Sequence, residues 1–138
     1  MKLEAKEILH LHVICGKDME VKEDGRGYLR VIPIVGGTFD GIVSGTIVPG
    51  GADWNTTYRE GVAHVFAKYL LKTEDGIYIA IENEGKIDFS KEVRIRTVPK
   101  FQVSNDSSLA WLNIGVYVAE LNFGEKPGQI EIVIYQLS

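Results

Sequence analysis

The stretch from Pro33 to Trp54 reads PIVGGTFDGIVSGTIVPGGADW, and it indicates the fold more directly than any other part of the chain. Six of the chain's 15 glycines lie between Gly36 and Gly51, where they punctuate two short runs typical of β-strands. Glycine lets a backbone bend sharply or approach a neighbouring strand closely. The pattern predicts short strands, the second of which ends in a tight Pro-Gly-Gly turn that places Asp53 and Trp54 next to each other.

The rest of the chain also consists of short apolar runs separated by Gly, Pro, Asn and Asp. Runs that alternate, or that are dense in β-branched residues, are typical of strands. The pattern predicts strands at 8–15, 28–35, 39–48 (in two pieces), 62–72, 77–82, 93–98, 111–121 and 130–137, with 83–85 as a turn and Pro99 as a strand end. About eight evenly spaced strands are typical of an all-β sandwich or barrel. Because several strands are apolar on both faces, a closed barrel is favoured, and we expect a single antiparallel β-barrel domain over residues 1–138.

One segment, 60–73, fits two structures. Val62, Val65, Phe66 and Tyr69 match the spacing of a helical stripe, and the Ala, Lys and Leu content of the segment favours a helix. The same residues also fit strand alternation, and Glu74-Asp75-Gly76 suits a hairpin turn into the next run. Because both neighbouring segments indicate strands, we expect a strand here.

The length, charge and cysteine content of the chain exclude several classes of function. The chain has 138 residues, enough for one domain with its own core, and a net charge of −4, with no basic stretch suited to nucleic acid. Cys15 is the single cysteine, so no internal disulfide can form, which fits a reducing compartment. Neither a signal-like N-terminus nor an apolar segment of about 20 residues is present. We therefore expect a soluble cytoplasmic protein that binds neither nucleic acid nor membrane.

Several motifs together resemble a family of small, largely bacterial proteins of unknown function. The most specific is Pro-Gly-Gly-Ala-Asp-Trp at 49–54, preceded by Pro-Ile-Val-Gly-Gly-Thr-Phe-Asp-Gly at 33–41. Supporting matches follow in order: Tyr69 with Thr73, Asp75 and Gly76; Asn83 and Gly85; Arg96 and Thr97 with Pro99 and Phe101; Ala-Trp-Leu-Asn at 110–113; and Tyr-Gln-Leu at 135–137. Residues 119–121, where similar sequences tend to carry glycine, depart from the pattern. The resemblance implies an antiparallel barrel similar to that of allene oxide cyclase, with residues 62–72 as a strand, and it implies no settled activity.

Asp53 and Trp54 are the first candidates for a ligand site. At the mouth of a barrel, Asp53 would act as a base or a hydrogen-bond acceptor, and Trp54 would stack on a planar ligand. The structural alternative has Asp53 capping its turn, as Asp side chains often do, while Trp54 plugs one end of the barrel. The sequence leaves both alternatives open.

A second group of candidates comes from the predicted strands and their ends: Tyr69, Asn83, Arg96, Trp111 and Asn113. Strand ends and loops are where a barrel presents a ligand. Arg96 would pair with a ligand carboxylate or, as the structural alternative, with Asp53 or Glu82 in an internal salt bridge. Trp111 and Asn113 would share one strand face as an aromatic platform and an amide, or equally belong to a satisfied core. Tyr69 would be a proton donor or a packing residue.

Metal and thiol chemistry have weak support in the sequence. His10 and His12 share one face of a predicted strand, but a third ligand would have to come from His64 or a carboxylate, and no zinc-type spacing is present. Cys15 has no activating cation close to it in sequence and is expected to be a small buried apolar residue. We expect no metal and no cofactor.

Three functions fit these observations. The first is a barrel whose partly apolar lumen binds a small apolar or aromatic ligand, with Asp53, Arg96 and Asn113 orienting its polar end. The second is an isomerase or cyclase in the same barrel, with Asp53 as the base and Arg96 or Tyr69 stabilising the developing charge. The third is a structural or oligomer-forming module whose lumen is filled by side chains. No catalytic residue is assigned, and whether the chain forms a homo-oligomer is left open.

Overall fold

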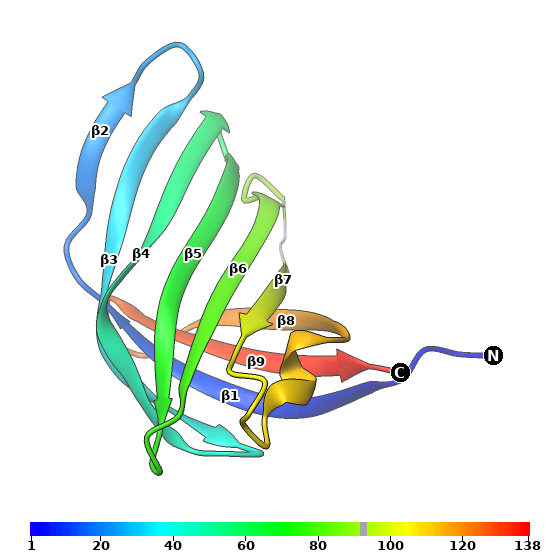
Figure 1. Cartoon of the computed structure of the whole chain (residues 1–138). Coiled ribbons are helices and arrows are strands. Elements are labelled where there is room, and N and C mark those ends of the chain that lie inside the picture. The colour runs from blue at the N-terminus through cyan, green and yellow to red at the C-terminus, as the bar shows by residue number, and fades with distance from the viewer. Residues whose placement is uncertain (92–93) are drawn as a thin grey trace.

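The computed structural model of the chain describes residues 1–91 and 94–138, and it is all-β apart from one short 3₁₀ helix. The strands are β1 (Ala5–Cys15), β2 (Met19–Glu23), β3 (Tyr28–Gly41), β4 (Gly45–Arg59), β5 (Val62–Thr73), β6 (Tyr78–Asp88), β7 (Ile95–Gln102), β8 (Val116–Phe123) and β9 (Gln129–Leu137); the helix is η1 (Ala110–Asn113). Figure 1 shows the strands in the order in which they wrap.

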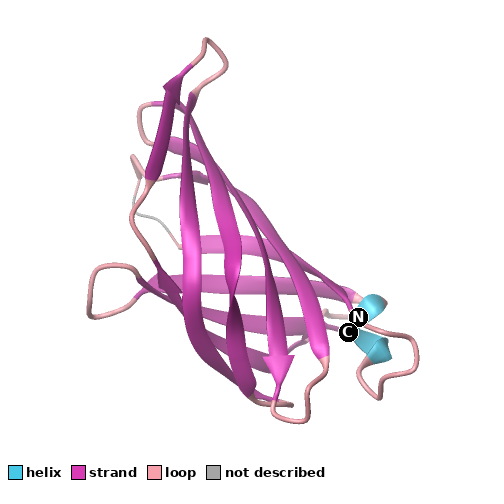
Figure 2. Cartoon of the chain, turned by 60° about the vertical axis from the view of Figure 1, so that its left-hand side comes forward, coloured by secondary structure: helices cyan, strands magenta, loops and turns pink. Residues whose placement is uncertain are grey.

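Eight of the strands form a closed antiparallel barrel, which confirms the predicted fold. The strands pair in the order β1-β9-β8-β7-β6-β5-β4-β3-β2, and an additional β1–β3 pairing closes the cylinder. β2, which the sequence pattern did not predict, pairs with the first four residues of β3, Tyr28–Val31, and extends the wall there (Figure 2). Within the part of the chain that the structure describes, no helix has the length and apolar character needed to cross a membrane.

The prediction for 62–72 is confirmed, because β5 spans Val62–Thr73 and pairs along its length with β6. Several strand boundaries were wrong. β6 continues through residues 83–85 to Asp88, and β7 continues through Pro99, which faces inward and pairs with Asn83. Residue 93, the predicted start of that strand, lies outside the described residues. The predicted strand at 111–121 is instead η1 followed by β8, which begins at Val116.

The Pro-Gly-Gly segment is not a turn, which corrects the prediction for this part of the sequence. It lies inside β4, where the register with β5 shifts between Val48 and Ala52, so it forms a bulge. A Cβ on Gly51 would lie 2.4 Å from the Cβ of Tyr69, so glycine lets β5 approach β4 closely here. The chain reverses earlier, between β3 and β4, and β4 runs on with Asp53 and Trp54 on opposite faces.

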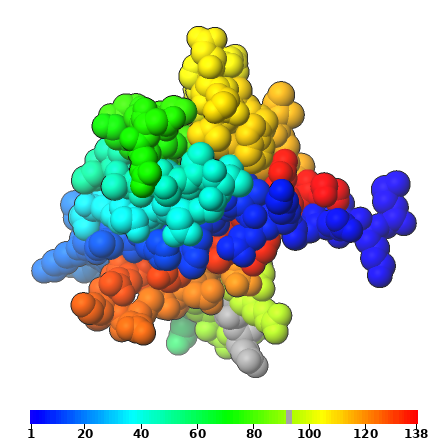
Figure 3. All heavy atoms as spheres, turned by 90° about the horizontal axis from the view of Figure 1, so that it is seen from below, coloured from blue at the N-terminus to red at the C-terminus, as the bar shows by residue number. Residues whose placement is uncertain are grey.

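One end of the barrel is filled by side chains. This end holds the β3–β4 and β5–β6 turns, η1 and the two termini, where Glu4 and Ser138 exchange two backbone hydrogen bonds (Figure 2). Its buried side chains include Leu9, Leu11, Phe39, Ile47, Leu71, Ile79, Ile81, Leu109 and Leu112. The N-terminal residues stand away from this body in Figure 3. The barrel is therefore closed at this end, which we call the packed base.

Candidate functional site

The other end of the barrel contains a cavity of about 330 Å³. It lies where β1 ends, where β4 meets β5 and where β8 meets β9, opposite the packed base. Phe123 on its rim is 69% exposed, so the cavity reaches the surface of the molecule. Most of the wall is apolar and includes Ile32, Ile34, Val65, Ile95, Leu121 and Ile132. A volume of this size lies in the range of small-molecule sites, which run from about 300 to 1,000 Å³.

Strand alternation brings a few polar side chains to this apolar wall. Asp53 and Asn55, two residues apart on β4, both face the cavity. The adjacent strands β5 and β6 contribute Tyr69 and Asn83, and the end of β1 contributes Cys15. The polar groups therefore come mainly from three consecutive strands, and they lie against one side of a largely apolar cavity.

Asp53 is held in place by the neighbouring strand. Its Oδ1 accepts a hydrogen bond of 2.9 Å from the backbone N–H of Phe66 on β5. Burial raises the pKa of this carboxyl above its ordinary value, and it outweighs the Phe66 N–H, the Asn55 amide and the charges of His64 and Arg30, all of which lower the pKa. Asp53 therefore holds a proton more readily than an exposed aspartate.

Three side chains of the cavity wall, Asn55, Tyr69 and Asn83, carry polar atoms that find no hydrogen-bond partner among the described residues. The hydroxyl of Tyr69 and Oδ1 of Asn83 are both covered from solvent, in residues only 4% and 3% exposed. Burial raises the pKa of the Tyr69 phenol, so it remains a neutral hydrogen-bond donor. A buried polar atom without a partner costs about 1–3 kcal/mol, so a ligand that supplies the missing partner gains that energy.

Cys15 also lies against the cavity, half-buried and without a disulfide. Burial raises the pKa of its thiol, and the negative charges of Asp53 and Asp18 raise it further. The thiolate, the reactive form of cysteine, is therefore disfavoured. Cys15 contributes a small, weakly polar surface to the cavity and is no activated nucleophile.

Of the seven candidate residues, the structure brings three together: Asp53, Tyr69 and Asn83 all line the cavity. Trp54 does not join them, because it follows Asp53 on a strand and so faces outward, 54% exposed. The expected Asp-Trp corner at the barrel rim is therefore wrong in its geometry. Asp53 reaches the cavity as an inward-facing strand residue.

Arg96 lies on the outer face of β7, whose residues alternate strictly between buried and exposed. Its Nη2 is 3.2 Å from Oε2 of Glu120 on the neighbouring β8. The expected pairing with Asp53 or Glu82 inside the barrel is therefore wrong, and so is the expectation that Arg96 would orient a ligand's polar end in the lumen. The alternation of Ile95 and Thr97 around Arg96 in the sequence already indicated an outward side chain.

Trp111 and Asn113 lie at the packed end of the barrel, on η1. The Asn113 side chain brackets the backbone of Val103: its Oδ1 accepts from the Val103 N–H at 2.8 Å, and its Nδ2 donates to the Val103 carbonyl at 2.7 Å. This amide holds the loop that covers the base. Neither residue lines the cavity in the barrel lumen, which corrects the expectation that Asn113 would help to orient a ligand there.

Sequence reasoning missed Asn55 and assigned Cys15 only a packing role. The signal for Asn55 was present, because Asp53 and Asn55 are two residues apart and must share a face if the chain is a strand there. Interpreting Pro-Gly-Gly as a turn broke the strand at that point. A bulge in a continuous strand has the same glycine-rich signature, and only the pairing with β5 distinguishes the two.

Comparison with known proteins identifies relatives along the whole chain. Residues 4–137 match the family described as "Protein of unknown function (DUF3237)". A UPF0311 protein of Bradyrhizobium diazoefficiens is 30% identical over 132 residues, covering 85% of this chain and 86% of the relative.

Solved structures share the barrel. A conserved protein of unknown function from Rhodopseudomonas palustris is 26% identical, with a TM-score of 0.87, and the match covers 100% of this chain and 99% of that one. A structure described as an enzyme from Penicillium herquei has a TM-score of 0.79 over 100% of this chain and 96% of that one; at 17% identity this likeness shows the fold alone. By the extent of the family match and the identity to its relatives, the chain belongs to the DUF3237 family of proteins of unknown function.

Proposed function

We propose that the protein binds a small, largely apolar molecule, planar or aromatic in part and carrying a hydroxyl or carbonyl group, in the cavity of its barrel. The observation that carries this proposal is the cavity of about 330 Å³ that combines an apolar wall with Asp53, Tyr69 and Asn83. An apolar site with a few placed polar groups is typical of small-molecule binding. Phe89 and Phe123 also line the cavity and would contact the ring of an aromatic ligand.

The polar side of the cavity supports a ligand that both donates and accepts hydrogen bonds. Oδ1 of Asn83 needs a donor, whereas the Tyr69 hydroxyl needs an acceptor, and neither finds one among the described residues. A ligand hydroxyl provides both, once small side-chain rotations uncover the two atoms. The chemistry of the wall therefore favours a phenol or alcohol over a pure hydrocarbon.

The fluorescent compounds 2-naphthol and naphthalene test this proposal, because they differ by one hydroxyl. Titration of the protein with each should give saturable binding, with 2-naphthol tighter by about tenfold, the value of one to two hydrogen bonds. Tyr69→Phe and Asn83→Leu should each reduce the preference, because each removes one of the unpaired polar atoms. Trp54→Phe, on the outer face of β4, is the matched control and should bind both compounds as the wild type does.

Two results would overturn the proposal. One is the absence of saturable binding of either compound. The other is an unchanged preference for 2-naphthol in both Tyr69→Phe and Asn83→Leu, which would place binding elsewhere on the molecule.

An isomerase or cyclase activity in the same cavity is the second candidate, and the raised pKa of Asp53 favours it. A carboxylate with a raised pKa is a stronger base, suited to taking a proton from carbon beside a carbonyl group. The proton would pass to the Asp53 carboxylate and the electron pair to the carbonyl oxygen, which the Tyr69 hydroxyl would stabilise.

Exchange of carbon-bound protons tests this second candidate directly. In D₂O, the protein should speed deuterium incorporation beside the carbonyl of 2-tetralone, as followed by proton NMR. Asp53→Asn should abolish the acceleration while binding 2-naphthol normally. If the wild type and Asp53→Asn exchange at the same rate, the base role is excluded and the binding role stands on its own test.

A further inference from the structure

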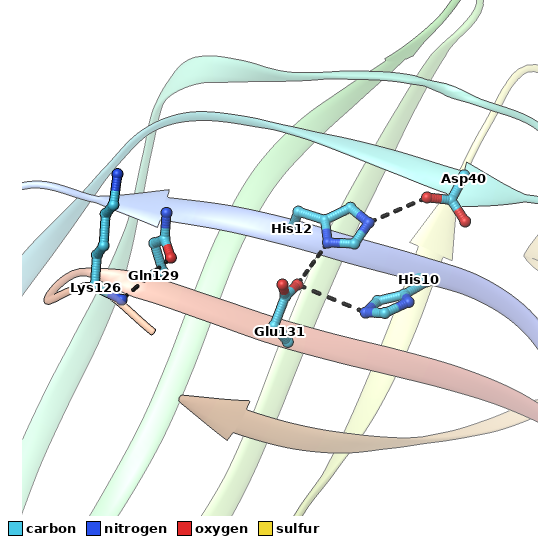
Figure 4. Close-up of polar contacts among 6 residues, drawn as sticks. All are labelled: His10, His12, Asp40, Lys126, Gln129 and Glu131. Carbon is cyan, nitrogen blue, oxygen red and sulfur yellow. Dashed lines mark hydrogen bonds and ion pairs between the residues drawn. The ribbon is translucent and has the colours of Figure 1, made fainter. Parts of the chain in front are cut away.

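A cluster of metal-binding side chains lies on the outer wall of the barrel, away from the cavity. His10 and His12 alternate on β1 and therefore share its outer face. β1 pairs with β3 on one side and β9 on the other, so that Asp40 lies opposite His10 and Glu131 lies opposite His12. These three strands are the adjoining cyan, blue and red bands of Figure 3, and Figure 4 shows the four side chains converging.

The separations within the cluster suit a single ion. One ligand atom from each of His10, His12 and Asp40 lies within 4.8 Å of the others. Nε2 of His12 is 3.1 Å from Oδ2 of Asp40. Two ligands of one tetrahedral zinc ion, each at about 2.0–2.1 Å from the metal, lie roughly 3.3 Å apart. The His12–Asp40 pair already has that spacing, and His10 needs only a small side-chain movement to join it.

One nitrogen of the cluster lacks any hydrogen-bond partner among the described residues. Nε2 of His10 is covered from solvent, and the Oε2 of Glu131, 3.5 Å away, does not form a hydrogen bond with it. The rings of His10 and His12 lie against each other with centroids 4.3 Å apart. A covered imidazole nitrogen 3.5 Å from one carboxylate, in a ring that lies against a second imidazole and close to Asp40, is an arrangement that a cation stabilises.

Glu131 supplies the support that metal-binding histidines usually have. Its Oε2 is 2.7 Å from Nδ1 of His12, which donates its N–H to the carboxylate, so that Nε2 is directed toward Asp40, where a metal ion would replace the Nε2 proton. A carboxylate that holds one nitrogen of a histidine while the other nitrogen binds the metal is the common arrangement in zinc proteins. Glu131 thus orients His12, whereas Asp40 contacts the ion.

We propose that His10, His12 and Asp40 form a binding site for a divalent transition metal of the zinc type, with Glu131 as the positioning residue behind His12. Two imidazoles and one carboxylate match the ligand preference of Zn²⁺, whereas Ca²⁺ and Mg²⁺ prefer oxygen ligands. A depression of about 150 Å³ beside the cluster, lined in part by His12, Thr38 and Glu131, leaves room for water as the fourth ligand.

An ion at this position would join the two strands whose pairing closes the barrel. His10 and His12 belong to β1, the strand that closes the barrel by pairing with β3, and Asp40 belongs to β3. An ion bound to all three would join two strands that are far apart in sequence. Because only the folded chain brings these ligands together, the metal would stabilise the native state.

Metal binding by the full chain, purified without metal, tests the proposal. Calorimetric titration with Zn²⁺ should show one equivalent bound, and Co²⁺ should give the intense visible absorption of tetrahedral coordination. His10→Gln and Asp40→Asn should weaken Zn²⁺ binding and remove the Co²⁺ spectrum. Glu131→Gln should weaken binding by about 10–100-fold, as expected for a residue that orients a ligand, while largely preserving the spectrum.

His64→Gln is the matched control. His64 on β5 forms the same kind of contact, with Nε2 2.9 Å from Oε2 of Glu84, but it lies outside the cluster. This variant should bind Zn²⁺ as the wild type does, and Zn²⁺ should raise the melting temperature of both but not of His10→Gln. The proposal is overturned if the wild type binds less than one equivalent or if His10→Gln binds normally. It is equally overturned if His64→Gln loses binding to the same extent, because the metal would then be held nonspecifically.

Discussion

At the scale of the residue, Asp53 shows how burial changes the chemistry of a side chain. Its carboxyl is removed from water by the barrel wall, and its pKa is raised in the folded state. Ionising it therefore costs more in the folded protein than in the unfolded one. The free energy of unfolding should decrease as pH rises from the ordinary pKa of 3.8 through the folded pKa, and the penalty should be complete above it.

Asp53→Asn should remove this penalty. Measured by urea unfolding at a series of pH values, the stability of the variant relative to the wild type should increase between about pH 4 and the folded pKa and then level off. Asp106→Asn, on an exposed loop, is the control for the substitution itself. A relative stability of Asp53→Asn that falls with rising pH would show that the folded carboxylate is stabilised instead.

Two buried tyrosines allow the unpaired hydroxyl of the cavity to be tested. The Tyr69 hydroxyl has no partner among the described residues, whereas the Tyr117 hydroxyl donates to the carbonyls of Trp111 and Ile114, at 3.3 and 3.1 Å. Tyr69→Phe should therefore raise the free energy of unfolding by about 1 kcal/mol, and Tyr117→Phe should lower it by about the same amount. Equal destabilisation by both substitutions in urea melts would mean that Tyr69 is satisfied in solution.

At the scale of the element, the bulge in β4 brings β5 close and sets the position of Asp53. Gly51 is essential to it, because an added Cβ would lie 2.4 Å from the Cβ of Tyr69 and 2.5 Å from the Lys68 carbonyl oxygen. Gly51→Ala should lower the free energy of unfolding by about 1–3 kcal/mol, the usual cost of overpacking, and should shift the amide signal of Phe66 in NMR spectra. Thr56→Ala, on the same strand, should leave that signal in place.

Most of the fold could be predicted from the alternation of side chains along single strands. The alternation from Ile95 to Phe101 and the dense β-branched residues from Ile77 to Ile81 mark strands without any tertiary knowledge. Their ends could not be located, because Asn83, Gly85 and Pro99 usually terminate strands. In this barrel they remain inside strands because pairing with neighbours outweighs local preference.

At the scale of the whole molecule, the barrel is packed at one end and hollow at the other. The open end is what the proposed binding function requires, whereas a purely structural barrel would be filled by side chains at both ends. Ala67 lines the cavity on β5, and Ala119 lies in the packed base on β8, 1% exposed. Both positions are alanine, so one substitution compares the two ends.

Ala67→Phe should place its ring in the cavity, leave the free energy of unfolding nearly unchanged and abolish 2-naphthol binding. Ala119→Phe should find no space and lower the free energy of unfolding by about 1–3 kcal/mol. Chemical denaturation and ligand titration of the two variants provide the measurement. Equal destabilisation by both would indicate that the lumen collapses in solution, and the protein would then be a structural module.

The candidate site was only partly accessible to sequence reasoning. Asp53 was selected because it follows a predicted turn, and Tyr69 and Asn83 because they lie on predicted strands or at their ends, and the barrel does bring the three together. Arg96, Trp111 and Asn113 were selected in the same way but lie elsewhere. Arg96 faces outward, as its alternation with Ile95 and Thr97 indicated, and residues 110–113 form η1 where a strand was predicted. The spacing of His10 and His12 already placed both on one strand face, but Asp40 and Glu131 join them from two other strands, so no local spacing could indicate which carboxylates complete the cluster.

The sequence by itself determined that the chain is all-β and predicted that its antiparallel strands close into a barrel, because side-chain alternation and glycine placement act over a few residues, but it predicted shorter strands than the structure has. Only the tertiary structure decided which end is filled, that Asp53 faces inward and Trp54 outward, and which carboxylates meet the two histidines. Those outcomes depend on register between strands, and a shift of one residue in register exchanges the inner and outer faces of a strand.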